Sequence, residues 1–343
     1  MLEIDGSYGE GGGQLLRTTV ALAAITGKSV RIADIRARRD TPGLAPQHLA
    51  AVRAVAALCD ARTDGLALRS TALVFCPGRL RVVEVRCDVG TAGSITLVLQ
   101  ALLPAMLRAG GPCRATVIGG TDVRQAPPVD YLRHVLLPLL RRMGARIQID
   151  VVRRGYYPRG GGEVAVTVAP GPLRPLRLDA PGGVRALRGV AHTASLPEHI
   201  AERMRRAAAE RLAAGGLGPA QLETCLCDPA QAMGQGGAVV VWAETDTTVL
   251  GAARTAERGV RAEALGEAVG AELTADWNAG ATVDLHAADQ LLVYLALAGG
   301  GSFVARALSS HARTAMWLIE HFLSVRFAMR EQGPVVRLDV VPA

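Results

Sequence analysis

Lysine and aromatic side chains are both scarce in this sequence of 343 residues. Lys28 is the only lysine, which argues against enzymes that gather several lysines around a small anion. It lies in TGKSV rather than in Lys-x-Asp-Gly, which argues against a lysine-using nucleotidyl ligase, and we expect it to be a cation at a helix C-terminus. Aromatic residues make up only 3% of the chain, but half of all residues are hydrophobic. We therefore expect a sizeable core of Leu, Val, Ile and Ala.

The chain also lacks paired cysteine motifs and long apolar runs. Its six cysteines form no Cys-x-x-Cys pair, which is typical of reduced thiols in a cytosolic protein. The longest apolar run, ITLVLQALLPAML at 95–107, is interrupted by Gln100 and Pro104 and is too short to span a membrane. The N-terminal stretch MLEIDGSYGE is acidic and has no apolar signal core. We expect a soluble, cytoplasmic protein with no membrane partner.

Positive charge is plentiful and comes almost entirely from arginine. The formal net charge is +7 and the pI is about 9.5. Arginine binds phosphate through a planar fork of donors. A basic chain favours phosphates or nucleic acid over acidic partners. The composition therefore indicates a ligand that carries phosphate.

Three segments of the chain share one pattern of elements. They begin near residues 9, 90 and 285, and each runs from small or polar residues through an apolar helix and a glycine stop into a strand. A polar loop and a second, amphipathic helix follow. Gln14 and Gln100 are 86 residues apart, whereas Gln100 and Gln290 are 190 apart, which is 104 residues more. A segment is therefore inserted before the third unit.

We predict from this pattern an α/β (α+β) protein with three repeated units. Repeats one and two would occupy residues 1–184 and the third repeat residues 280–343. A small α/β domain would be inserted at 185–279, where the sequence has its own amphipathic helices and its own apolar strand. The alternative is that the three segments look alike only because all α/β units do.

The stretch SYGEGGGQLLRTT at 7–19 combines a carboxylate, three glycines and an arginine at the start of a helix. Backbone N–H groups at a helix N-terminus bind anions, and glycine lets a phosphate approach them closely. Glu10 beside such a site would suit a divalent metal, and Arg17 lies two turns further along on a similar face. The alternative is a tight turn with an exposed glutamate and an arginine that reaches solvent.

The stretch RARRDTPGLAPQHL at 36–49 gathers cations and polar side chains around one loop, namely Arg36, Arg38, Arg39, Gln47 and His48. Alternation along a strand would put Arg36 and Arg38 on one face, with Arg39 at the end of the strand. Such a cluster suits a triphosphate or RNA phosphates. A solvated basic edge explains it equally well.

Three further stretches carry candidate residues. HAADQ at 286–290 opens the third apolar helix, where Asp289 would either cap the helix or contact a ribose or a metal. SSHART at 309–314 places His311 in the first helical turn behind a serine cap. A helix N-terminus lowers the pKa of histidine and keeps it neutral and nucleophilic, although a structural histidine is the alternative. In RRGYYPRGGGEV at 153–164, glycines before a strand indicate close backbone approach to a neighbouring element or to substrate.

Taken in order, these motifs resemble those of the RNA 3′-terminal phosphate cyclase family. RGYYPRGGGEV is similar to the family signature of Arg or His, Gly, two residues, Pro, one residue and three Gly. The other matching stretches span the whole chain and are GSYGEGGGQLLRT, PGLAPQHL, TAGSITLVLQ, APPVDYL, HAADQ and SSHART. The resemblance implies three βαβαββ-type units, like the C-terminal domain of translation initiation factor three, with a smaller α/β domain inserted.

The resemblance also implies a reaction and its site residues. The family converts an RNA 3′-terminal phosphate into a 2′,3′-cyclic phosphodiester, using ATP and a divalent metal (Mg or Mn), through a histidyl-AMP and an RNA-adenylate. By position in the matching motifs, His311 would be the nucleophile and Glu10 the metal ligand. The other implied contacts to ATP or RNA come from Arg17, Arg36, Arg39, Gln47, His48, Gln100, His286, Ala287, Ala288, Asp289 and Gln290.

One departure and three alternatives qualify this reading. Where the family usually has Thr-Asn, this chain has Thr314-Ala315, and the missing amide would weaken ribose or loop contacts. A non-catalytic cyclase-like RNA-binding protein of ribosome assembly would keep the fold, but such relatives lose the histidine. A carboxyvinyl transferase would need several lysines. A plain RNA-binding module would form no covalent adduct with labelled ATP.

Overall fold

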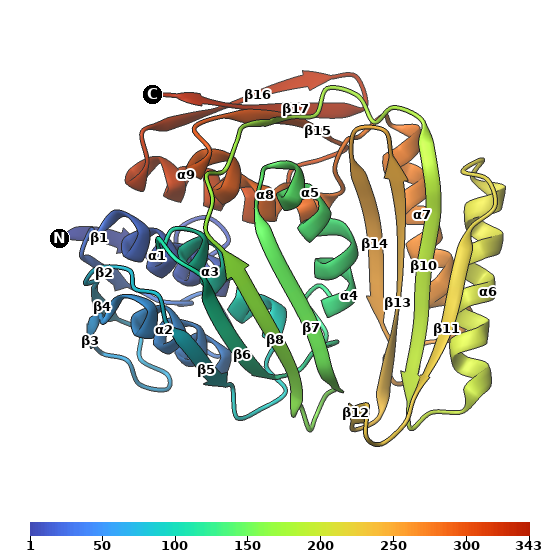
Figure 1. Ribbon diagram of the computed structural model, residues 1–343, viewed down its shortest axis with the longest axis horizontal. Coiled ribbons are helices and arrows are strands. Elements are labelled where there is room, and N and C mark those ends of the chain that lie inside the picture. The colour runs from blue at the N-terminus through green and yellow to red at the C-terminus, as the bar shows by residue number, and fades with distance from the viewer.

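Four mixed β-sheets with helices packed on them form the protein, and the computed structural model describes all of residues 1–343 (Figure 1). Three of the sheets share one strand order. In each, the first and second strands are parallel neighbours, and the fourth strand pairs antiparallel between the second and the third. The mixed α/β class predicted from the sequence is confirmed.

The strands of the four sheets have the following bounds in spatial order. The first sheet consists of β1 (Leu2–Asp5), β2 (Val30–Ala33), β4 (Leu73–Cys76) and β3 (Arg62–Asp64). The second consists of β5 (Glu84–Asp88), β6 (Cys113–Gly119), β8 (Gly162–Ala169), β7 (Arg146–Gly155) and β12 (Ala232–Met233). The third consists of β9 (Leu176–Arg177), β15 (Gly301–Ala305), β17 (Val335–Pro342) and β16 (Val325–Gln332). The fourth consists of β11 (Gln221–Cys227), β10 (Val184–Ala194), β13 (Gly236–Thr245) and β14 (Val249–Thr255).

Each of the first three sheets comes with a first and a second helical stretch. The first sheet has α1 (Gly13–Thr26) and α2 (Pro46–Cys59). The second has α3 (Ile95–Leu107) and then, without a break, α4 (Val129–Tyr131), the π-helical turn η1 (Leu132–Leu136) and α5 (Leu137–Arg142). The third has α8 (Leu285–Leu297) and α9 (Ser310–Phe322). The fourth sheet has α6 (Glu198–Ala214) and α7 (Ala262–Asn278).

Two hydrophobic cores divide the molecule. The apolar helices α1, α3 and α8 belong to a cluster of 76 buried residues that runs through the first three sheets and their helices. A second cluster of 16 buried residues lies between the fourth sheet and α6 and α7. The fourth sheet and its two helices therefore bury an apolar face of their own.

The chain passes between the sheets at two places that the sequence did not indicate. β9 pairs with β15, so the chain enters the third sheet before it builds the fourth. β12 leaves the fourth sheet and pairs with the end of β7 (Figure 1). Neither of these two strand pairings tests where one domain ends and the next begins. The domain boundaries at 184/185 and 279/280 therefore stay a prediction.

The basic loop after β2 does not have the geometry expected for it. β2 ends at Ala33, and Arg36 has a left-handed backbone with φ +55°. The Arg39 N–H donates to the Arg36 carbonyl at 3.0 Å, as in a turn. The expectation that strand alternation aligns Arg36 with Arg38 is wrong, because the chain turns before it reaches them.

Two smaller expectations concern Lys28 and the membrane. The Lys28 Nζ donates to the Phe322 carbonyl at 3.0 Å, at the last turn of α9. Lys28 is therefore a C-terminal cation, but for α9 rather than for the helix that it follows in sequence. No helix has both the length and the apolar character required to cross a bilayer.

Candidate active site

A cavity of about 920 Å³ brings together the N-terminal ends of α1, α8 and α9 and the start of α7. Its wall combines arginines, histidines and carboxylates, which is the composition expected around a phosphate ligand. Eleven of the thirteen residues implied by the resemblance line it, namely Glu10, Arg17, Arg36, Arg39, Gln47, His48, Gln100, His286, Asp289, Gln290 and His311.

The two exceptions are Ala287 and Ala288. Both are fully buried in the large hydrophobic core, on the side of α8 that faces away from the cavity wall. Helical periodicity explains the split, because His286, Asp289 and Gln290 share one face and the two alanines lie on the other. The alanine side chains therefore do not reach the cavity.

His311 and Glu10 lie next to each other although 301 positions separate them in the sequence. Ser309 caps α9 by accepting a hydrogen bond from the Ala312 N–H at 3.0 Å, so His311 stands in the first turn as predicted. The His311 Nδ1 is 3.0 Å from the Glu10 Oε2, and Arg39 pairs with the other oxygen of Glu10. The two groups are close enough for an ion pair, and neither of these atoms has a hydrogen-bond partner.

Thr314 fixes the glycine loop to α9. Its Oγ1 accepts a hydrogen bond from the Glu10 N–H at 3.1 Å and donates one to the Ser310 carbonyl at 2.8 Å. Gly9 has φ +58°, and a Cβ there would collide with the Thr314 hydroxyl. The loop therefore needs glycine at this position to reach the helix that carries His311.

The environment of His311 keeps its imidazole neutral. Burial is the main cause of its lowered pKa; Asp289 opposes the shift, and the charges of Arg17 and Arg39 add to it. The direction is the one predicted from the sequence, but the first cause is desolvation. The Ser309 hydroxyl donates to the Asp289 Oδ1 at 2.6 Å, which ties Asp289 to the start of α9.

Asp289 is not the helix cap that the sequence allowed as its alternative role. Asp284 caps α8, because its Oδ1 accepts from the N–H groups of His286 and Ala287, both at 3.0 Å. Asp289 lies more than one turn further on and faces the cavity. Asp284 therefore fills the capping role, and the prediction that Asp289 contacts a ribose or a metal stays open.

Arg17 and Arg36 are cations without a carboxylate partner. Arg17 is only 6% exposed, its guanidinium donates to the Gln100 Oε1 at 3.3 Å, and its Nε has no partner. Burial lowers the pKa of Arg17 to about 10, so it stays charged at neutral pH. Arg36 donates to the Gly43 carbonyl at 2.8 Å. A buried charge without a counter-ion is costly, so this wall is arranged for an anionic ligand.

His48 is held neutral beside these arginines. Burial, followed by the charges of Arg17 and Arg36, lowers the pKa of His48 to about 3. Its Nδ1 accepts a hydrogen bond from the Ala45 N–H at 3.0 Å, which satisfies the backbone donor of the residue before α2. The other ring nitrogen points at Gly13, where a Cβ would collide with it. Gly13 therefore permits α1 to begin against His48.

Several residues of the site escaped the sequence analysis. Arg254, Thr255 and Glu257 line the cavity from the 185–279 segment, and no local motif marks them. Asp284 is fully buried and accepts hydrogen bonds from the Tyr131 hydroxyl at 2.5 Å and the Gly251 N–H at 3.0 Å. It thereby joins α8 to the second unit and to β14. An aspartate directly before an apolar helix is typical of an N-cap, so the sequence could have indicated this role of Asp284.

Ala315 lies next to residues of this wall. Ala315 is 5% exposed and lines a separate cavity of about 30 Å³ together with Gln100, Asp289 and Gln290. The amide expected from the resemblance would therefore point between the ligand-facing side chains rather than into the open cavity.

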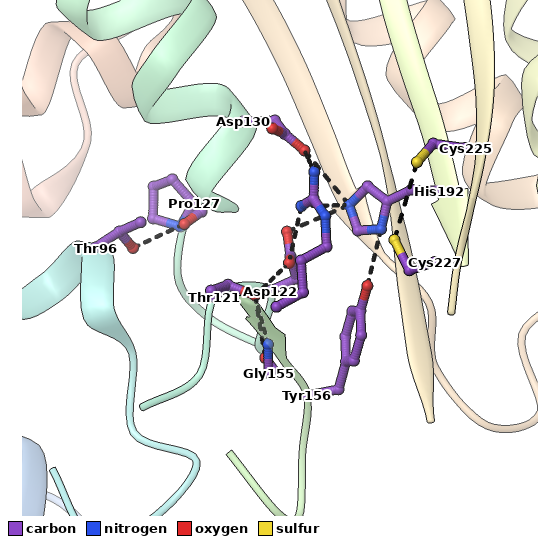
Figure 2. A network of polar contacts seen from close by, with 11 residues as sticks. Thr96, Thr121, Asp122, Pro127, Asp130, Gly155, Tyr156, His192, Cys225 and Cys227 are labelled. Atoms are coloured by element: carbon purple, nitrogen blue, oxygen red, sulfur yellow. Dashed lines mark hydrogen bonds and ion pairs between the residues drawn. The ribbon is translucent and has the colours of Figure 1, made fainter. Parts of the chain in front are cut away.

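Glu10 is one candidate ligand for a divalent metal, and an acidic cluster elsewhere is the other. The Glu10 Oε2 is buried and lacks a hydrogen-bond partner, and Mg²⁺ commonly uses one or two carboxylates together with substrate phosphates. Asp122, Asp130 and His192 are also close enough to share an ion. There the Arg154 guanidinium already pairs with both carboxylates, at 3.3 and 2.7 Å. Figure 2 labels Asp122, Asp130 and His192. Arginine takes the place of a cation in that cluster.

Comparison with known proteins agrees over the full length. The profile of a family described as RNA 3′-terminal phosphate cyclase matches residues 8–329. An RNA 3′-terminal phosphate cyclase of Nitrosospira multiformis is 54% identical over 100% of this chain and 97% of its own. Those of Pyrobaculum neutrophilum and Thermococcus kodakarensis are 45% and 46% identical, each over 99% of this chain and 98% of their own. The chain therefore belongs to the RNA 3′-terminal phosphate cyclase family.

Proposed function

We propose that this protein converts the 3′-terminal phosphate of RNA into a 2′,3′-cyclic phosphodiester, using ATP and a covalent histidyl-AMP on His311. The observation that carries the proposal is the pairing of a neutral imidazole with buried, unpartnered arginine charge in one cavity. The imidazole supplies a nucleophile, and the arginines supply a place for phosphates. Membership of the family supports the same reaction.

The first step transfers AMP to the protein. Because the Nδ1 of His311 faces Glu10, the Nε2 is the nitrogen left to attack the α-phosphorus of ATP. A P–N bond forms, the bond between the α-phosphorus and the bridging oxygen breaks, and pyrophosphate leaves with that oxygen. Arg17, Arg36 and Arg39 would hold the triphosphate and offset the charge that develops on it.

The next two steps pass AMP to the RNA and close the ring. An oxygen of the RNA 3′-phosphate attacks the adenylyl phosphorus, the P–N bond breaks, and His311 is restored. The neighbouring 2′-hydroxyl then attacks the activated RNA phosphorus and loses its proton to a base or to water, and AMP leaves. Gln47, Gln100, His286, Asp289 and Gln290 would position the nucleotide, with Asp289 and Gln290 closest to it.

Glu10 would hold a divalent metal, Mg or Mn, through its unpartnered oxygen. When bound, the ion would neutralise phosphate charge beside the nucleophile. The role of the protein there is to fix the carboxylate, which it does through the hydrogen bond from the Glu10 N–H to Thr314 and the ion pair with Arg39.

Labelling with ATP that carries ³²P at the α-phosphate tests the proposal. We expect acid-labile, alkali-stable label on the wild-type protein, because a phosphoramidate to histidine has that stability. His311→Asn should abolish the label. His321→Asn is the matched control, because His321 lies on the same helix but is exposed at its last turn. Label that survives in His311→Asn, or no label on the wild type with either metal, would contradict the proposal.

A further inference from the structure

A second and larger cavity adjoins the nucleotide cavity. Its volume is about 1200 Å³, and it lies between the second unit and the 185–279 segment. The two cavities share part of their walls, so they lie side by side. The shared residues are Gln47, Gln125, Thr255, Glu257, Val260 and Leu265. A ligand too long for the first cavity would therefore have the second beside it.

The wall of this second cavity is basic. Four arginines line it against two carboxylates. Both carboxylates are already neutralised, since Asp122 pairs with Arg154 and Glu257 pairs with Arg124 at 3.1 Å. Arg258 and Arg261 are exposed and have no carboxylate partner in the structure. The uncompensated charge therefore lies on the loop between β14 and α7, where it attracts an anionic chain.

An exposed aromatic ring stands in the same wall. Tyr157 is 73% exposed, which is unusual in a chain with so few aromatic residues. Its neighbour Tyr156 is buried, and its hydroxyl lies 3.0 Å from the His192 Nδ1 in the polar network of Figure 2. Glycine packing fixes the backbone around both rings, because a Cβ at Gly155 or Gly162 would meet the other strand. Tyr157 is thus presented from a rigid base.

We propose that the second cavity holds the RNA strand on the 5′ side of its terminal phosphate, with a base stacked on Tyr157 and backbone phosphates on Arg258 and Arg261. The inference rests on the proposed function, which places the 3′-phosphate beside His311. Aromatic stacking combined with a basic groove is how proteins bind single-stranded nucleic acid without reading its sequence. The shared wall places the second cavity next to the one in which the 3′-phosphate would bind.

Direct binding tests the inference separately from the chemistry. The probe is a 5′-fluorescent, single-stranded oligoribonucleotide with a 3′-phosphate, about ten nucleotides long, which lies within known single-strand site sizes. Anisotropy titration gives its Kd for each variant. We expect Tyr157→Ala to raise Kd roughly 5- to 150-fold and Tyr157→Phe to leave it near the wild-type value.

The arginines have a separate signature in salt. For Arg258→Ala/Arg261→Ala we expect the slope of log K against log salt to become shallower by about 1.4, because each lost contact to a single strand contributes about 0.7. Arg114→Ala is the matched control, because Arg114 is exposed on β6, has no ion pair and lines neither cavity. Its slope should equal that of the wild type.

Self-adenylation with ATP alone should be unchanged in the Tyr157 and Arg258/Arg261 variants, since none of these side chains lines the nucleotide cavity. A Kd and a salt slope that stay at wild-type values in Tyr157→Ala and in the double arginine variant would overturn the inference. Failure of the proposed function has a different result, namely no label on the wild-type protein. The two failures are therefore distinguishable.

Discussion

Replacing Arg17 with methionine tests whether the cavity beside His311 is arranged for an anion. Burial lowers the pKa of Arg17 to about 10. At about 1.4 kcal/mol per pKa unit, the charged form carries a penalty of about 3 kcal/mol in the folded protein. The side chain is protonated in both the folded and the unfolded state at pH 7, so the whole penalty is present there. The substitution removes it and loses one hydrogen bond to Gln100, worth about 1 kcal/mol.

We therefore expect Arg17→Met to be about 2 kcal/mol more stable than the wild type in the absence of nucleotide, as measured by urea unfolding at pH 7. ATP should stabilise the variant less, because a bound ligand stabilises according to its affinity. A lost charge-assisted hydrogen bond costs about 1.5–3 kcal/mol, which raises the Kd for ATP roughly 10- to 150-fold. The gain in stability and the loss of binding should appear together.

Arg306→Met is the control, and its stability should change in the opposite direction. Arg306 donates to Asp276 at 2.8 Å, and that carboxylate is almost fully buried. Removing this arginine leaves the carboxylate without its partner, so the variant should lose about 1–3 kcal/mol. If Arg17→Met is also destabilised without nucleotide, or if it binds ATP as the wild type does, the reasoning about Arg17 is wrong.

Three further outcomes are expected. The pKa of His311 lies below its ordinary value of 6.5, so the rate of single-turnover adenylation should rise with pH and exceed half of its plateau by pH 6.5. A midpoint at or above pH 6.5 would contradict the lowered pKa. Thr314→Val should slow adenylation in a rapid-quench assay and lower the free energy of unfolding by about 1–2 kcal/mol. Thr26→Val loses only a bond to a backbone carbonyl within α1 and should leave the adenylation rate unchanged. Gly13→Ala should weaken ATP binding in calorimetry, because the new methyl group displaces His48; unchanged affinity would refute that role.

Much of the fold and site was readable because the signals are local. A serine before an apolar helix predicts a cap, and Ser309 is one. Glycines before a helix predict a close approach, and Gly9 has the left-handed backbone that this requires. Each of these features depends on interactions within a few residues, which the sequence displays directly.

The features that failed depend on partners far along the chain. Just before the turn at Arg36, the Ile35 N–H donates to the Thr71 carbonyl at 2.9 Å, a contact that strand alternation does not describe. Lys28 serves α9 because that helix ends beside it in space, 294 residues later. The contribution of Arg254 and Glu257 to the cavity follows from how the 185–279 segment packs. No local pattern contains that information.

The structure of the site explains why the glycine loop and the His311 motif, far apart in the sequence, belong to one site. α1 carries Arg17 and follows the glycine loop, α9 carries His311, and the two helices contact each other in the core. Packing of their apolar faces therefore holds the two ends of the chain together. The hydrogen bond between Glu10 and Thr314 then sets the register, and only glycine at position 9 leaves room for it. The glycines and the histidine are thus parts of one geometric requirement, because moving either would separate the carboxylate from the imidazole.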